Sequence, residues 1–163
     1  MRLLPSQKTS NYPSLKKRAR ACYEPSVPDF SFEKKIGGIV AGVDEVGRGP
    51  WAGPVVAAAV ILNEDDFPDG LDDSKKLTKR MREQLYEEIR NGSTVGIGQA
   101  SVEEIDALNI LQASLLAMRR AIIKLGDVPE AILVDGNNSP DCGQPVQCIV
   151  KGDSRSLSIA AAS

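Results

Sequence analysis

Apolar residues recur along the chain in two spacings, which together predict alternating strands and helices. Short apolar runs predict strands over 38–46, 55–62, 94–100, 130–135 and 146–150. Apolar positions three and four residues apart predict helices over 79–90, 102–107 and 110–125, and a further helix is expected from Ser156. This order predicts an α/β fold, in which helices pack on a mixed sheet.

Residues at the predicted boundaries agree with these ranges. Thr78 is expected to cap the helix over 79–90, and Ser101 with Glu104 has the spacing of a capping box. Gly126 is expected to end the long helix over 110–125. The strand over 94–100 contains two glycines, which are expected to weaken it.

Length and charge divide the chain into two parts. The 163 residues, 42% of them hydrophobic, are enough for one core and contain no apolar run that would span a membrane. The first residues lack the apolar centre of a secretory signal, so export is not expected. Residues 1–37 hold 8 Lys and Arg against 3 Asp and Glu. We interpret them as a basic, flexible arm that either touches nucleic acid or is simply solvated, and 38–163 as the catalytic domain.

The absence of histidine limits the chemistry more than the charge does. Without histidine, the chain has no Ser-His-Asp or Cys-His catalysis and no histidine-bound zinc. Its three cysteines, Cys22, Cys142 and Cys148, lack CxxC spacing and are interpreted as reduced thiols of a cytoplasmic protein. Catalysis would then depend on Asp, Glu, Lys, Arg or Tyr side chains or on a metal with oxygen ligands, and oxygen ligands favour Mg²⁺ or Mn²⁺.

Acidic residues stand at the ends of two predicted strands. Asp44 and Glu45 end the strand over 38–46, and Asp135 ends the strand over 130–135. Carboxylates that converge there repel one another unless a cation lies between them. We therefore predict that Asp44, Glu45 and Asp135 hold two divalent ions that hydrolyse a phosphodiester. For Asp135 the simpler alternative, an Asp-Gly turn, is equally open.

Several residues near these acids are suited to a phosphate backbone. Glycines allow a close approach of the main chain, arginine can pair with phosphate through two hydrogen bonds, and hydroxyl and ammonium groups can hold phosphate oxygens. The candidates are Gly47, Arg48, Gly49, Ser74, Lys75 and Lys151. For the run around Ser74 and Lys75, a solvated charged loop is an equally good interpretation.

Six segments in this order resemble the bacterial ribonuclease HII family. They are GVDEVGRGP at 42–50, AGPVV at 52–56, DDSKKL at 72–77, VDGN at 134–137, IVKGD at 149–153 and SIAAAS at 158–163. The resemblance covers 38–163 and leaves 1–37 outside it.

The resemblance implies an RNase H-like fold and an endonuclease that uses Mg²⁺ or Mn²⁺. Its implied substrates are RNA–DNA hybrids and duplex DNA with embedded ribonucleotides, and its implied products carry 3′-hydroxyl and 5′-phosphate ends. By position, Asp44, Glu45 and Asp135 correspond to metal-binding acids, and 47–49 to the segment that senses the 2′-hydroxyl. A role in DNA replication and repair, and a monomeric state, are expected with it.

One departure from the family is expected. The resemblance puts a fourth acid about two turns along the helix that begins near Ser156, beyond Ser163. The chain is therefore interpreted as truncated at its C-terminus and weakly active. Two other functions stay open: a remnant that binds hybrids without cutting, and a metal-dependent phosphohydrolase of small phosphate esters.

Overall fold

The computed structural model describes residues 27–49 and 53–163, and the predicted strands and helices are all present in it. The strands are β1 (Val40–Val46), β2 (Val55–Ile61), β3 (Thr94–Ala100), β4 (Ala131–Asp135) and β5 (Val146–Ile149). The helices are α1 (Ser31–Ile36), α2 (Lys79–Gly92), α3 (Val102–Leu108), α4 (Ile110–Ile123) and α5 (Leu157–Ala162), with a 3₁₀ turn η1 at Gly152–Ser154. Among the described residues, α1 and η1 were not expected from the sequence.

The strands form one mixed sheet in the order β3-β2-β1-β4-β5. The neighbours β1, β2 and β3 are antiparallel, whereas β4 lies parallel to β1 and β5 lies parallel to β4. The chain reaches β4 only after α3 and α4, as a parallel neighbour requires a crossover. This topology confirms the predicted α/β class.

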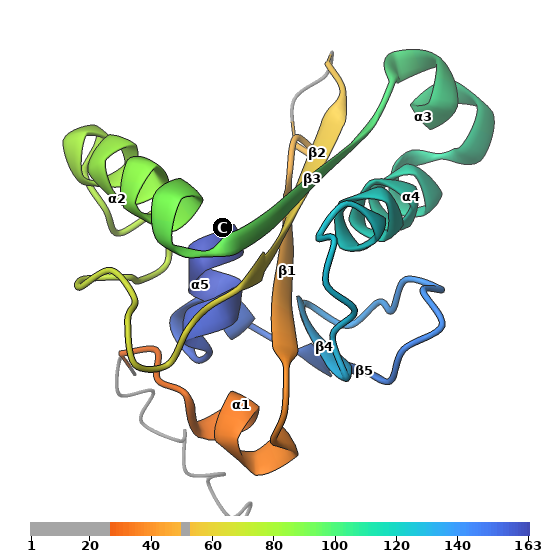
Figure 1. Cartoon of the computed structure of the whole chain (residues 1–163). Helices are drawn as coiled ribbons and strands as arrows, with labels where there is room; N and C mark the ends of the chain where they lie inside the picture. The colour runs from red at the N-terminus through yellow and green to blue at the C-terminus, as the bar shows by residue number, and fades with distance from the viewer. Residues whose placement is uncertain (1–26, 50–52) are drawn as a thin grey trace, which may run out of the picture.

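Helices cover both faces of the sheet (Figure 1). On one face, α4 packs its small residues Ala113, Ala117 and Ala121 against β1, β2 and β3. On the other face, α5 packs against β1 and β2, and Leu85 and Ile89 of α2 join the same apolar cluster. Because β1 lies at the centre of the sheet, both layers bury it.

Glycines bring the helices unusually close to the strands. A Cβ on Gly98 would lie 2.0 Å from the carbonyl oxygen of Ala117 in α4, and one on Gly42 would lie 2.0 Å from the carbonyl carbon of Ser158 in α5. The glycines of β3 therefore serve packing, and the expectation that they weaken the strand misses this role.

The two predicted N-terminal caps are also present, whereas α4 ends at Ile123, before the predicted Gly126. The Thr78 hydroxyl accepts a hydrogen bond from the Met81 amide at 3.3 Å. Ser101 and Glu104 form the complete capping box of α3, with each side chain accepting from the other's backbone amide. Asn109 then ends α3 and begins α4 in a single residue with φ of 73°.

Part of the predicted basic arm is folded in the structure. Residues 31–36 form α1, and the aromatic rings of Phe30 and Phe67 meet edge to face at 5.0 Å. The segment was interpreted as flexible because six residues are too few to reveal a helical period. The rest of the predicted arm, 1–26, lies outside the described residues.

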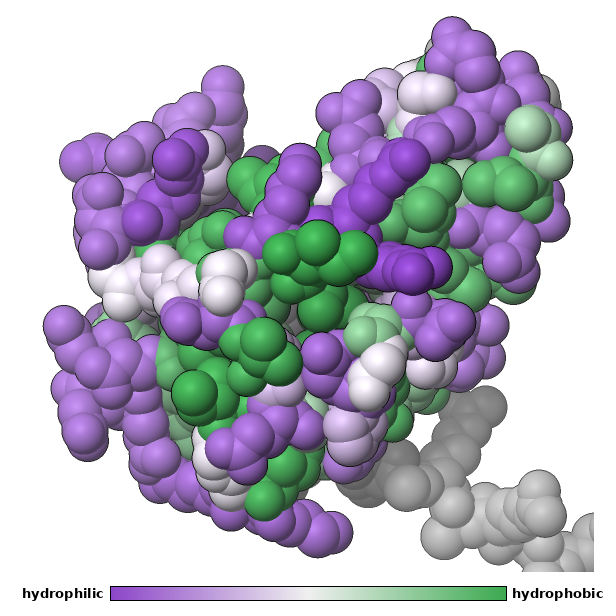
Figure 2. All heavy atoms as spheres, turned by 45° about the vertical axis from the view of Figure 1, so that its right-hand side comes forward, coloured by the Kyte–Doolittle hydropathy of each residue, from purple (hydrophilic) through white to green (hydrophobic). Residues whose placement is uncertain are grey.

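The surface is mostly hydrophilic but carries several hydrophobic patches on the face drawn in Figure 2. The most exposed large hydrophobic side chains of the described residues include Val128 at 74% and Ile123 at 70%. Within the described ranges, no helix is both long and apolar enough to cross a bilayer. Cys142 and Cys148 are free thiols, as predicted, and Cys22 lies outside the described residues.

Candidate active site

Two of the predicted acids meet at the ends of neighbouring parallel strands. Val43 of β1 is paired with Val134 of β4, so Asp44 and Asp135 each come directly after this pair. Side chains alternate along a strand, and Leu133 packs with Ile159 of α5. Asp135, two residues after Leu133, therefore faces the α5 side of the sheet, as does Asp44, two residues after Gly42.

A third acid, Asp153, joins them from the turn η1. Asp44, Asp135 and Asp153 each offer a carboxylate oxygen, and these atoms all lie within 4.8 Å of one another. The Gly152 amide donates to Asp135 Oδ1 at 2.6 Å, which ties the turn to the end of β4. Asp44 and Asp153 are almost completely buried, at 8% and 5% exposure.

This geometry makes the ionised form of these acids costly. Burial, followed by the negative charge of Asp135, raises the pKa of Asp44 to about 7. The same two causes raise the pKa of Asp153, although a hydrogen bond from Lys75 opposes them. A cation shared by the three carboxylates would relieve both effects. Their donor atoms are all oxygen, which suits a hard divalent ion such as Mg²⁺ or Mn²⁺.

Lys75 brings a positive charge to this group of acids. Its Nζ lies 3.3 Å from Asp153 Oδ2 and 3.5 Å from Asp73 Oδ1, while most of the side chain stays exposed. The single ammonium group of Lys75 does not balance the three carboxylates, so the site keeps an excess of negative charge. The arrangement fits the binding of a divalent cation.

Glu45 takes a different position from the one predicted. It lies outside the group of three, because neighbouring residues of a strand point to opposite faces. Its Oε1 accepts a hydrogen bond from Arg48 at 2.8 Å. Glu45 nevertheless lines a cavity of about 90 Å³ together with Arg48 and Asp135, on the α4 side of the strand ends.

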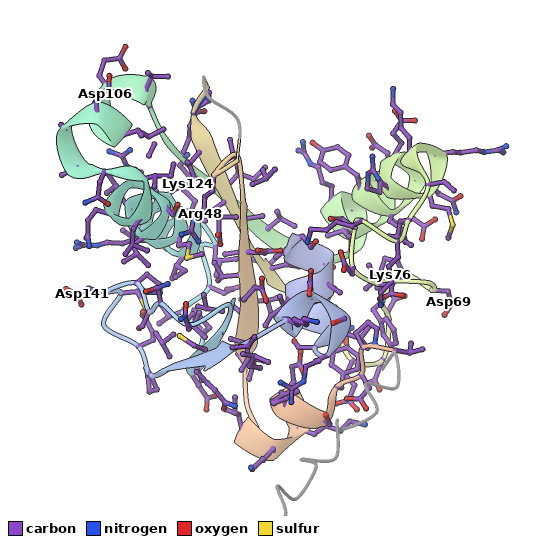
Figure 3. The ribbon with its side chains drawn as sticks, turned by 180° about the vertical axis from the view of Figure 1, so that it is seen from behind. Arg48, Asp69, Lys76, Asp106, Lys124 and Asp141 are labelled. Carbon is purple, nitrogen blue, oxygen red and sulfur yellow. The ribbon has the colours of Figure 1, made fainter. Side chains whose placement is uncertain are left out.

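The predicted phosphate-binding residues lie on both sides of the acids. Gly47, with φ of 99°, turns the chain after β1, and Arg48 and Gly49 follow it at the surface. Figure 3 shows Arg48 on the α4 side of the central strands and Lys76, the neighbour of Lys75, in a loop on the opposite side.

The remaining two candidates belong to the α5 side. The Ser163 hydroxyl donates to the Ser74 hydroxyl at 2.9 Å, so the loop of Ser74 reaches the last residues of α5. Lys151 precedes η1 with φ of 56°, a left-handed conformation that is uncommon outside glycine and asparagine. A strained residue two positions before Asp153 helps to shape the turn that carries this acid.

Comparison with known proteins identifies the family. The sequence profile described as Ribonuclease HII matches residues 41–163. The chain belongs to the ribonuclease HII family. It is 58% identical over 137 residues to the Ribonuclease HII of Jannaschia sp., an alignment that covers 83% of this chain and 69% of that protein. With the Ribonuclease HII of Paramagnetospirillum magneticum it shares 59% over 141 residues, or 84% and 70% of the two chains.

The fold comparison agrees with this ribonuclease HII assignment. The chain is 32% identical to the RNase HII in a structure of the PCNA:RNase HII complex from Archaeoglobus fulgidus, with a TM-score of 0.64. The superposition covers 76% of this chain and 68% of that one. The predicted RNase H-like mixed sheet is thereby confirmed.

Sequence reasoning missed Asp153 as a member of the acidic group. The residue was noted only as the last of the IVKGD segment at 149–153, without a metal-binding role, although it follows a predicted strand and a glycine. With Asp44, Glu45 and Asp135, it supplies a fourth acid within 163 residues. Expecting this fourth acid beyond Ser163 was therefore wrong on the geometry, and the reason given for weak activity does not hold.

Proposed function

We propose that this member of the ribonuclease HII family hydrolyses the RNA strand of RNA–DNA hybrids and cuts beside single ribonucleotides in duplex DNA. The observation that carries the proposal is the group of Asp44, Asp135 and Asp153, whose oxygens lie within 4.8 Å of one another. The family match supports the same reaction. We keep the products expected from the sequence, 3′-hydroxyl and 5′-phosphate ends.

Mg²⁺ or Mn²⁺ would be held by Asp44, Asp135 and Asp153, with Glu45 at the neighbouring strand position. When bound, such ions activate water and stabilise the leaving oxygen of a phosphodiester. The protein's own part is to hold the acids in place before the metal arrives. Gly152 fixes Asp135 through its amide, and the Glu45 amide donates to Asp44 Oδ1 at 2.7 Å.

The groups beside the acids supply contacts for the nucleic acid. Arg48 is kept near the strand end by Glu45, and its guanidinium suits contact with a phosphate. Ser74, Lys75 and Lys151 would contact the phosphate backbone from the other side. We propose that the turn of Gly47 and Gly49 meets the ribose 2′-hydroxyl, the group that distinguishes RNA from DNA. The Gly47 turn is held tightly, since a Cβ there would meet the Pro54 carbonyl oxygen at 2.6 Å.

Other parts of the assignment follow from this proposal. Removal of ribonucleotides from duplex DNA is a step of DNA replication and repair, and the free thiols of Cys142 and Cys148 suit a reducing cytoplasm. We also propose that the protein acts as a monomer.

The test is cleavage of a labelled DNA duplex that contains one ribonucleotide, with Mg²⁺ or Mn²⁺ and with a chelator. We expect a single cut that depends on the metal and leaves a 5′-phosphate. The same duplex with a deoxynucleotide at that position is the control and should stay intact. An uncut ribonucleotide duplex under metal-replete conditions would contradict the proposal.

The same experiment separates the other two functions. A protein that shifts the hybrid in a binding assay but never cuts it would be a binding remnant. A protein that releases phosphate from small phosphate esters, and ignores the duplex, would be a phosphohydrolase of small molecules.

A further inference from the structure

The residues just before the part matched by the family profile are attached to the turn that carries Asp153. The profile match begins at residue 41, whereas the attachment involves residues 29–33. Asp29 forms a parallel bridge with Ser156. The Asp29 amide donates to the Arg155 carbonyl at 3.4 Å, and the Leu157 amide donates to the Asp29 carbonyl at 3.2 Å. The two segments are more than 120 residues apart in the sequence.

Glu33 of α1 makes the central contact. Its Oε1 accepts hydrogen bonds from the Ser156 hydroxyl at 2.6 Å and from the Ser158 amide at 3.1 Å, and the residue is only 9% exposed. The Ser156 hydroxyl in turn accepts from the Ile159 amide at 3.3 Å, which begins α5. A buried carboxylate therefore holds the residues three and five positions after Asp153.

A third contact joins the same two segments through Phe32 and Arg155. The guanidinium of Arg155 lies 5.0 Å from the centre of the Phe32 ring, a cation–π geometry. Asp29, Phe32 and Glu33 thus contact every position from Arg155 to Ser158. We call these three residues and their contacts the N-terminal clasp.

The clasp and the acidic group hold the turn η1 from its two ends. Before Asp153, the Gly152 amide is bound to Asp135 Oδ1. After Asp153, the Arg155 and Ser156 amides donate to the Gly152 carbonyl at 2.9 Å each, and Ser156 is bound to Glu33. Asp153 has little freedom to turn away while both ends are held.

We propose that Glu33 is a positioning residue for Asp153, acting through Ser156 and Ser158. This inference rests on the proposed function, in which Asp153 helps to hold a divalent ion. Groups that orient metal ligands typically change metal affinity by about 10- to 100-fold when they are removed. Substitution of Glu33 should therefore weaken metal binding, although it changes no residue that is proposed to contact the metal or the hybrid.

The test compares Glu33→Ala with Glu33→Gln. Alanine removes the acceptor of both hydrogen bonds, whereas glutamine keeps an acceptor at the Oε1 position. Mn²⁺ binding is measured by calorimetry well below the unfolding temperature, together with kcat and KM on the ribonucleotide duplex. For Glu33→Ala we expect about tenfold weaker Mn²⁺ binding and a lower kcat, with KM for the duplex unchanged. Glu33→Gln should recover most of both losses.

Glu64→Ala is the matched control on the same region. Glu64 forms its ion pair with Lys34 of α1 at the surface and not with a clasp residue. We expect its metal affinity to equal that of the wild type, which shows that loosening α1 alone is not the cause. If Glu33→Ala does not fold, Phe32→Leu takes its place, with the same direction of change expected.

Three results distinguish this inference from the proposed function. A folded Glu33→Ala with wild-type Mn²⁺ affinity and kcat, beside a wild type that binds and cleaves, overturns the clasp alone. Equal losses in Glu33→Gln and Glu33→Ala also overturn it, because the acceptor would not matter. A wild type that binds no Mn²⁺ overturns the proposed function, and the clasp with it.

Discussion

Asp44 shows how a functional residue works against the stability of its own fold. Its carboxyl group is buried at the end of the central strand, close to those of Asp135 and Asp153. A buried acid of this kind favours its protonated form until a cation is present. The position is therefore adapted to metal binding rather than to folding.

The first prediction concerns the pH dependence of the metal-free protein. Because the pKa of Asp44 is raised from 3.8 to about 7, the folded state keeps a proton that the unfolded state releases. This contribution to stability is complete below about pH 4 and is lost as the pH rises towards 7. Asparagine does not ionise, so Asp44→Asn should not lose stability over this pH range. At pH 8 the metal-free variant should be more stable than the wild type by roughly 2 to 4 kcal/mol.

Chemical denaturation at pH 5 and pH 8 with a chelator measures this effect. The Asn variant should also lose cleavage of the ribonucleotide duplex. If Asp44→Asn is less stable than the wild type at pH 8, the prediction is wrong. The ionised Asp44 carboxylate would then be stabilised in the folded protein by an interaction other than its described contacts.

Lys75 gives a second prediction. It lies beside Asp153 but is mostly exposed, so we expect it to serve the nucleic acid more than the acids. Lys75→Met should raise KM for the duplex roughly fivefold, the equivalent of about 1 kcal/mol. The slope of the logarithm of the duplex-binding constant against the logarithm of the salt concentration should become shallower by about one. This is the change expected for one lost phosphate contact.

Lys79→Met is the control, because Lys79 is an exposed lysine that pairs with Glu83 on the surface of α2. Its KM and salt dependence should stay at wild-type values. An unchanged salt slope in Lys75→Met would remove Lys75 from the nucleic-acid interface.

The sequence predicted Asp44 and Asp135 as partners but not their true third member. The two acids follow apolar strands, a pattern that can be seen along the chain. Asp153 depends on a 3₁₀ turn after the short strand β5, and on the parallel pairing of β4 with β5. Neither feature has a periodicity that would reveal it from the sequence. Glu45 was predicted beside Asp44, but strand alternation separates their side chains.

At the level of elements, the hydrophobic pattern was enough to predict every strand of the sheet. The boundaries agree within a residue or two, since each strand is a short apolar run that ends near turn residues. The distances between elements could not be predicted in this way. Gly42 is an example, because its role depends on α5, which lies more than 110 residues later.

Gly42→Ala is therefore the prediction that tests the packing of α5 on β1. A Cβ there would lie 2.0 Å from the Ser158 carbonyl carbon and 2.3 Å from the Ile159 amide, so α5 must move. We expect a loss of about 3 kcal/mol in the free energy of unfolding. Gly92→Ala is the matched control, since nothing lies within 4 Å of its Cβ position.

Urea denaturation compares the two alanine variants. Gly92→Ala, at the end of α2, should be neutral or more stable by up to about 1 kcal/mol. Equal stability of Gly42→Ala and the wild type would mean that α5 does not lie against β1 as described.

For the whole molecule, segments from the beginning, middle and end of the domain converge on one site. β1, β4 and η1 each carry one acid, and residues 29–33 support the last of them. Binding of a divalent ion should therefore stabilise the entire fold and not one loop. At a concentration 100 times the dissociation constant, the expected gain is about 2.7 kcal/mol.

Thermal unfolding with and without Mn²⁺ measures this gain. The unfolding temperature of the wild type should rise with Mn²⁺ concentration, whereas that of Asp135→Asn should change little. An equal rise in both proteins would indicate that the ion binds elsewhere.

The central claim is that Asp153 completes a metal site with Asp44 and Asp135, and calorimetric titration of Mn²⁺ into Asp153→Asn tests it most directly. We predict a dissociation constant at least about tenfold above that of the wild type, in a protein that remains folded. An unchanged dissociation constant would contradict the account, because Asp153 would then lie beside the metal without holding it.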